Sequence, residues 1–150
     1  MCFARVPRRR VEEWLRVLNE ISTLPSKLVE RLGKVTLILY GSYARGDFNL
    51  WSDVDLLVIS ERFEGIRPLD RYDLVKEVLP SRAEAILFTP KEMRICLKKP
   101  VWRQALTRGA VIVHDDYGFE GELQARRIRT IGIVSFIEQV RKLLENTVEV

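Results

Sequence analysis

Two aspartates, Asp53 and Asp55, stand at the start of an apolar run, "SDVDLLVIS". Side chains alternate between faces along a strand, so both carboxylates project from one side while Val54 points into the core. Carboxylates this close repel each other, and a divalent cation between them removes the conflict. Oxygen ligands of this kind suit Mg²⁺, which binds through a few carboxylates together with substrate phosphates. The pair therefore predicts a magnesium site.

A Gly-Ser step, Gly41-Ser42, precedes this pair and is separated from it by the ten residues 43–52. Glycine lets the backbone leave the apolar strand in a sharp turn without a Cβ in the way. Ser42 is expected to cap a short helix over "YARGD". The first N–H groups of such a helix, together with the serine hydroxyl, are donors for phosphate oxygens. The step therefore predicts a phosphate cradle facing the metal.

A third acid, Glu84, is the only acid in the short apolar run "RAEAILF". It is expected to bind the catalytic metal and to help activate an incoming hydroxyl, and two metal ions would clamp an in-line displacement at phosphorus. Each feature has a plainer interpretation: a simple turn, a surface or capping pair of aspartates, and an edge-strand charge that discourages aggregation. The joint order of the three features favours catalysis.

Hydrophobic periodicity and turn residues predict the elements that position these groups. Strands are expected over 34–40, 52–60, 82–88 and 110–114, and helices over 9–32 with a break at Pro25, 68–79, 90–99, 101–109 and 120–145. Ser26 is expected to cap the second helix, and Thr89 the helix that begins at Pro90. In the helix over 68–79, the side chains of Leu69, Tyr72, Val75 and Leu79 are expected to face inward.

The helix expected over 120–145 carries two apolar strips. Its core-facing strip comprises Ile133, Phe136, Ile137, Val140 and Leu144. Ile128, Ile131 and Val134 fall near the opposite side of the helical wheel. This second strip is either a partner or dimer surface, or part of a helix buried on both sides.

Length and composition fit one domain, 1–150, with 47% hydrophobic and 31% charged residues. No run approaches the roughly 20 apolar residues of a membrane span, and the first residues do not resemble a secretory signal, so a cytoplasmic protein is expected. Cys2, Cys96 and His114 are interpreted as structural. Residues 91–108 contain six basic residues and one acid. This composition fits an RNA-binding surface and a solvated helical face equally well.

In these motifs the sequence resembles the minimal nucleotidyltransferases of the DNA polymerase beta-type superfamily. The matching residues are Gly41, Ser42, Asp53, Asp55 and Glu84. The third acid is often aspartate in that family. Glutamate is one methylene longer, so the metal geometry must adjust, but a working ligand is still expected.

The resemblance covers roughly residues 30–116, through "AEAILFTPKEM" to "RGAVIVHDD". It implies an α/β (α+β) nucleotidyltransferase fold, a short mixed sheet flanked by helices, with the site at one sheet end. The N-terminal helices over 9–32 and the C-terminal helix over 120–145 would flank that core. Arg45 falls in the phosphate loop, where it would contact the triphosphate or face solvent.

The activity that the resemblance implies is Mg²⁺-dependent transfer of AMP from ATP to a hydroxyl, with pyrophosphate leaving. Stand-alone members are often paired with a small helical HEPN-type protein in toxin–antitoxin modules, in which the transferase adds AMP to a toxin tyrosine. That is the favoured interpretation, with a HEPN-type partner or a homodimer expected. Transfer to RNA or a small molecule, and a non-catalytic module that binds nucleotide or a partner, are the alternatives.

Overall fold

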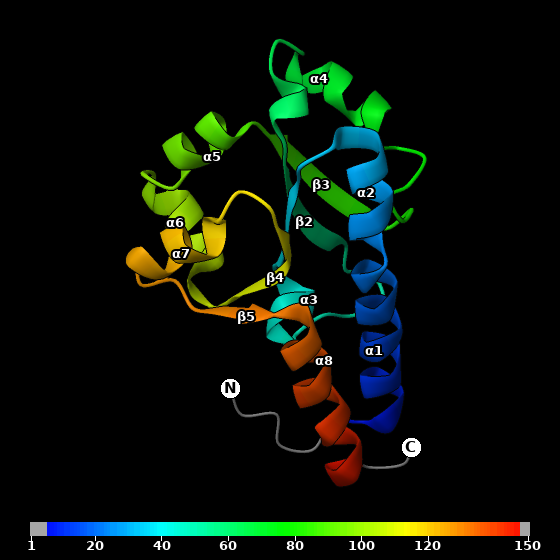
Figure 1. Cartoon of the computed structure of the whole chain (residues 1–150). Coiled ribbons are helices and arrows are strands. Elements are labelled where there is room, and N and C mark those ends of the chain that lie inside the picture. Colours follow the sequence, from blue (N-terminus) through cyan, green and yellow to red (C-terminus); the bar gives the residue numbers. More distant parts are fainter. Residues whose placement is uncertain (1–5, 148–150) are drawn as a thin grey trace.

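The computed structural model describes residues 6–147 and is built on a mixed five-stranded sheet (Figure 1). The strands are β1 (Thr36–Tyr40), β2 (Val54–Ile59), β3 (Ala83–Phe88), β4 (Ala110–Asp115) and β5 (Thr130–Gly132). Their order is β3-β2-β1-β4-β5. The central strand β1 is antiparallel to β2 and β4, whereas β2 pairs with β3, and β4 with β5, in parallel. The expected mixed sheet with flanking helices is confirmed.

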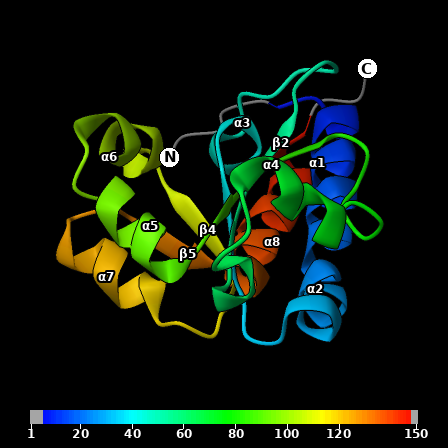
Figure 2. The ribbon, with the colours of Figure 1, turned by 90° about the horizontal axis from the view of Figure 1, so that it is seen from above.

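Helices cover both faces of this sheet (Figures 1 and 2). One face packs on α1 (Arg8–Ser22), α2 (Leu24–Leu32) and α8 (Ile133–Lys142), and the other on α5 (Pro90–Cys96), α6 (Pro100–Thr107) and α7 (Phe119–Ala125). The shorter elements are α3 (Ser42–Arg45), α4 (Pro68–Arg71) and the 3₁₀ turns η1 (Glu61–Phe63), η2 (Tyr72–Leu74) and η3 (Leu143–Asn146). In residues 6–147 no helix has the length and apolar character needed to cross a membrane.

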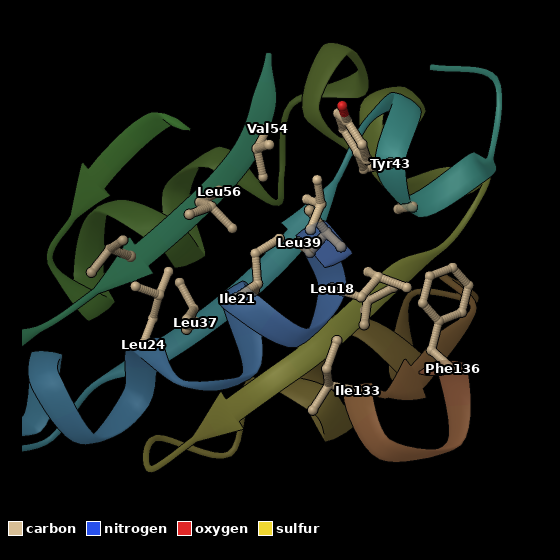
Figure 3. Packing of buried hydrophobic residues seen from close by; sticks show 14 of the residues in the cluster. Leu18, Ile21, Leu24, Leu37, Leu39, Tyr43, Val54, Leu56, Ile133 and Phe136 are labelled. Atoms are coloured by element: carbon tan, nitrogen blue, oxygen red, sulfur yellow. The ribbon is translucent and has the colours of Figure 1, made fainter. Parts of the chain in front are cut away.

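Strand alternation divides the buried side chains between two apolar clusters. Leu37, Leu39 and Leu56 join α1, α2 and α8 in the larger cluster, seen from close by in Figure 3. Ile38 and Leu57 point to the opposite face, where α5, α6 and α7 cover them. Both faces are thus buried, which is why the strands are continuously apolar in sequence.

The prediction of one helix over 120–145 is wrong. The chain instead forms α7, the short strand β5 and α8. Arg127 adopts a left-handed backbone with φ 61°, which ends the helical path, and the next residues pair with β4. Ile128 is buried in the smaller cluster, Ile131 packs against the larger one and Val134 is 74% exposed, so these three side chains share no surface.

The helix predicted over 68–79 is also wrong in extent and orientation. It ends at Arg71, and the chain continues through η2 and turns. Leu69 is 91% and Tyr72 50% exposed, whereas Arg71 is buried because its guanidinium donates hydrogen bonds to the carbonyls of Ile66 and Leu87. A hydrophobicity pattern cannot reveal an inward-facing arginine. Val75 is buried, as predicted.

The two capping predictions have different outcomes. Thr89 forms a capping box, in which its hydroxyl accepts from the N–H of Glu92 and the Glu92 carboxylate accepts from the N–H of Thr89. Ser26 is not a cap, because α2 already begins at Leu24, and its hydroxyl donates to the carbonyl of Thr23 instead.

Candidate active site

Sheet register brings two of the three predicted acids side by side. Asp55 of β2 pairs with Glu84 of the parallel strand β3 and with Tyr40 of the antiparallel strand β1. Residues directly opposite each other across strands project from the same face of a sheet. Asp53 lies two residues before Asp55, just ahead of β2, and Val54 between them is buried. The three acids therefore lie at one end of the sheet.

The Gly-Ser turn is packed directly against Asp55. Gly41 has φ 76° and ψ −153°, a backbone conformation that is essentially restricted to glycine. A Cβ built on Gly41 would lie 2.1 Å from Oδ2 of Asp55, far inside van der Waals contact. The absence of a side chain at position 41 thus makes room for the carboxylate, and the turn and the acid form one unit.

Helix α3 follows this turn. The N–H groups of Ala44 and Arg45 both donate to the carbonyl of Gly41 at 3.0 Å, and left-handed Gly46 ends the helix. Ser42 is the first helical residue and makes no side-chain cap, so the prediction that it caps the helix is wrong. The N–H of Ser42 and its hydroxyl lie at the turn, ahead of the amides that close the helix.

Arg45 lies near the acids. Its Nε donates to Asp47 Oδ2 at 3.0 Å, and its positive charge opposes the rise in the pKa of Asp55. It belongs to the loop in which a triphosphate contact is predicted, and that role stays a prediction.

The carboxylates act on one another electrostatically. The pKa of Asp55 is raised, first by burial and then by the negative charges of Glu84 and Asp53. Burial and the charges of Asp55 and Glu84 raise the pKa of Tyr40 to about 12. Neighbouring carboxylates of this kind attract a cation. Without one, the negative charge of each carboxylate makes ionisation of the next less favourable.

This donor set fits Mg²⁺. It consists of oxygen atoms alone, and Asp53 and Glu84 are exposed, so substrate phosphates can reach the same cation. Within residues 6–147 no three acidic, histidine or cysteine side chains already stand in a ready-made metal cluster. Carboxylates repel one another, and a bound cation would remove that repulsion.

Two aromatic residues beside the acids were not anticipated. Tyr40 shares the face of Asp55, and its ring lies 6.0 Å from that of Trp102 in α6, which in turn contacts Phe88. The sequence carried a signal for Tyr40, because it is the last residue of its strand before Gly41 and so lies at the turn beside which the acids are expected. Nothing local in the sequence indicates Trp102. His114 pairs with Leu37, toward the opposite end of β1 from the acids.

A strand, a Gly-Ser turn and paired acids at the end of a mixed sheet define a nucleotide-transferring class of domain, and comparison with known proteins agrees. The family model described as a nucleotidyltransferase domain matches residues 21–148. The chain belongs to this nucleotidyltransferase family, which makes it a transferase by class, and the resemblance seen in its motifs is confirmed.

A protein of Methanocaldococcus jannaschii named "Putative protein adenylyltransferase MJ1305" is 32% identical over 92 residues. The aligned part spans 57% of this chain and 61% of that relative's length. A crystal structure of a "putative nucleotidyltransferase" from Sulfolobus solfataricus superposes with a TM-score of 0.54 at 19% identity, over 63% of this chain and 85% of the other. At that identity the structural likeness shows the fold alone.

Proposed function

We propose that this protein transfers AMP from ATP to a hydroxyl group of a partner protein. The observation that carries the proposal is the close fit of Gly41 against Asp55, because it joins a turn suited to phosphate with a carboxylate suited to metal. The name of the Methanocaldococcus relative, a protein adenylyltransferase, supports adenylyl transfer to protein.

Asp53, Asp55 and Glu84 would hold Mg²⁺, and the N–H and hydroxyl of Ser42 would bind phosphate oxygens at the Gly41 turn. When bound, Mg²⁺ neutralises charge on the phosphate oxygens and lowers the pKa of a coordinated hydroxyl. Arg45 would add a positive charge on the triphosphate side. Catalysis of this kind depends on positioning and charge neutralisation.

Tyr40 is neutral at physiological pH because its pKa is about 12. It can therefore donate a hydrogen bond beside the acids but cannot serve as a base. The attacking hydroxyl oxygen would form a bond to the α-phosphorus. The bond between the α-phosphorus and the oxygen that bridges it to the β-phosphorus would break, and pyrophosphate would leave. The hydroxyl proton would pass to a carboxylate, for which exposed Glu84 is the candidate.

The acceptor that we propose is a tyrosine hydroxyl of a small helical HEPN-type protein, the arrangement of a toxin–antitoxin pair in the cytoplasm. A second copy of this chain is the other protein acceptor that the same chemistry permits. Since the aligned part spans less than two thirds of the relative's length, substrate and partner are both part of the proposal.

The test uses ATP labelled at the α-phosphate, Mg²⁺ and the product of the neighbouring gene. Label is expected on the partner with the wild-type chain and not with the Asp53→Asn, Asp55→Asn double variant. ATP labelled at the γ-phosphate is the control, and it should leave the partner unlabelled. Equal labelling by the double variant would refute the assignment of the acids.

Metal binding has a separate readout. Mg²⁺ with a non-hydrolysable ATP analogue is expected to raise the melting temperature of the wild type, because a ligand that binds only the folded state stabilises it. A chelator should abolish the shift, and the double variant should show none. An undiminished shift in the double variant would place the metal elsewhere.

A further inference from the structure

A groove of about 630 Å³ lies between the N-terminal half of α1 and the loop that joins α3 to β2. Phe48, Asn49 and Leu50 of that loop line one wall, and the same loop carries Asp53 three residues later. Arg82, two residues before Glu84, lines the groove as well. Two segments that form the groove thus continue along the chain into acids of the proposed active site, although Asp55 and Glu84 project from the face of the sheet opposite to Tyr43 and Phe48.

The floor of the groove is a stack of aromatic rings between two arginines. Phe48 lies on Tyr43 with ring centroids 4.4 Å apart, and both rings are almost completely buried. The guanidinium of Arg10 lies 4.9 Å from the centre of the Phe48 ring, and that of Arg82 lies 5.8 Å from the Tyr43 ring. This packing holds both guanidinium groups at the groove and limits their freedom to seek other partners.

The ion pairs among the residues of the groove leave unpaired positive charge at one end of it. Of the acids that line the groove, Glu13 pairs with Arg16 at 2.7 Å and with Arg82 at 3.5 Å, and Glu12 pairs with Arg8. Over residues 6–147 neither Arg9 nor Arg10 has a carboxylate within ion-pair distance, and Nε of Arg10 is shielded from solvent without a hydrogen-bond partner. Within the part of the chain that the structure describes, the charges of Arg9 and Arg10 in the groove therefore have no paired carboxylate.

The other end is apolar. Leu50 is 80% exposed, and Trp51, the next residue of the loop, is 89% exposed. Large exposed apolar side chains beside a groove mark a surface that another molecule covers. Trp51 lies two residues before Asp53, so whatever covers it lies close to the acids.

We infer that this groove docks the protein acceptor through a segment that combines acidic with apolar side chains, and so holds the acceptor at the end of the sheet where the acids lie. The inference rests on the proposed function. Acidic side chains of the segment face Arg9 and Arg10, and its apolar side chains cover Leu50 and Trp51. Charge complementarity of this kind fixes register and raises the association rate.

A protein segment fits better than a nucleic acid. Single-stranded nucleic acid needs a continuous basic track and exposed aromatic faces for its bases. Here two glutamates interrupt the basic track, the rings of Phe48 and Tyr43 are covered, and the exposed ring of Trp51 is a single stacking surface rather than a series. Arg9 and Arg10, which have no carboxylate partner within residues 6–147, suit a short pair of acids.

The test selects a displayed library of random dodecapeptides against the wild-type chain. The comparison is the Arg9→Glu, Arg10→Glu variant, which should fold because glutamate suits the first turn of a helix better than arginine. Lys27→Glu, Arg103→Glu is the control, since it makes the same change in net charge at exposed residues away from the groove. Melting temperatures of all three chains establish that each is folded.

Peptides with Asp or Glu next to apolar residues are expected from the wild type and the control. Their affinity should fall at least about tenfold in the groove variant. Selection of basic peptides, of no enriched sequence, or of acidic peptides that bind the groove variant equally would overturn the inference. So would binding of oligo(A) RNA that is lost in the groove variant while acidic peptides fail to bind.

Failure of this inference is distinguishable from failure of the proposed function. The Asp53→Asn, Asp55→Asn variant is expected to retain the selected peptides and to lose the thermal shift with Mg²⁺ and the ATP analogue. The groove variant is expected to show the reverse, with the thermal shift retained and peptides lost. Loss of the thermal shift in the groove variant as well would overturn the separation of docking from nucleotide binding.

Discussion

Gly41 carries two constraints at once, one from its backbone and one from its neighbour. Its φ of 76° with ψ of −153° excludes other residues on backbone grounds, at a cost of about 1–3 kcal/mol. Its missing Cβ leaves the space that Asp55 Oδ2 occupies. The second constraint ties this glycine to Asp55, because any side chain at position 41 must displace that carboxylate.

The chain offers a matched control for Gly41→Ala. Gly33, after α2, has φ 76° and ψ −130°, and a Cβ there meets nothing within 4 Å. Both alanine variants are expected to lose about 1–3 kcal/mol in urea unfolding from backbone strain, and Gly41→Ala should lose more than Gly33→Ala because its Cβ also displaces the Asp55 carboxylate. Only Gly41→Ala should also lose AMP transfer and the Mg²⁺-dependent thermal shift. Full transfer by Gly41→Ala would mean that contact with Asp55 is not needed for activity.

At the scale of elements, an ion pair between buried Arg71 and partly exposed Glu92 holds the segment that follows β2. Arg71, only 5% exposed, donates hydrogen bonds to both carboxylate oxygens of Glu92 in α5 and to the carbonyl of Leu87 in β3. Glu92 also closes the capping box with Thr89. One carboxylate thus joins α4, the end of β3 and α5.

Glu92→Gln removes the charge while retaining an oxygen for the capping box. The variant is expected to lose about 1–2 kcal/mol of stability at neutral pH, below the value for a fully buried pair because Glu92 is 38% exposed. The Arg71 hydrogen bond, as the largest cause, lowers the pKa of Glu92 from its usual 4.5. The wild-type advantage is therefore complete above that value and disappears as pH falls through the lower folded-state pKa.

Urea unfolding across this pH range measures the difference. The control is Glu77→Gln, which removes an exposed pair with Arg31 and should have little effect at any pH. Equal stability of Glu92→Gln and wild type at neutral pH would show that the pair contributes nothing to the fold.

The sequence predicted those elements whose signals are local. Gly33 and Gly41 bracket β1, and Thr89-Pro90 starts α5, because turn and capping chemistry acts over a few residues. The predictions that failed concern residues whose structure depends on partners far away in the sequence. Thr130–Gly132 forms a strand only because β4 offers an edge, and Arg71 faces inward only because Glu92 and Leu87 receive its hydrogen bonds.

For the acids, too, the local pattern predicted one part of the arrangement, and distant partners determine the other. Alternation predicted that Asp53 and Asp55 share a side, and buried Val54 agrees with it. The neighbourhood of Asp55 and Glu84 depends on strand order, which no local pattern shows, and the resemblance implied only that the site lies at one end of the sheet. The groove, with Arg10 over Phe48, joins residues far apart in sequence and had no local signal at all.

At the scale of the whole molecule, helices α1 and α8, which come from the N-terminal and C-terminal parts of the chain, complete the core on one face of the sheet. Trp14 of α1 and Phe136 of α8 contact edge to face, with ring centroids 5.7 Å apart, and both belong to the same apolar cluster as Leu37 and Leu39 of β1. These helices lie outside residues 30–116, which the resemblance in sequence motifs covers, although the family match over residues 21–148 includes α8. A sheet of which one face depends on both ends should unfold with them, and we propose that residues 6–147 form one cooperative unit.

Phe136→Ala tests this cooperativity against Val134→Ala in the same helix. Phe136 is 2% exposed, so its loss should cost about 3–5 kcal/mol. Val134 is 74% exposed, so its loss should change stability by about 0.5 kcal/mol or less. The measurement uses chains that also carry Trp51→Phe and Trp102→Phe, so that tryptophan fluorescence reports on Trp14. Fluorescence and far-ultraviolet circular dichroism, which reports on all elements, should give the same lowered urea midpoint in Phe136→Ala. If the fluorescence transition moved alone, α1 and α8 would form a unit separate from the sheet, and the acids at the end of β2 would not depend on them.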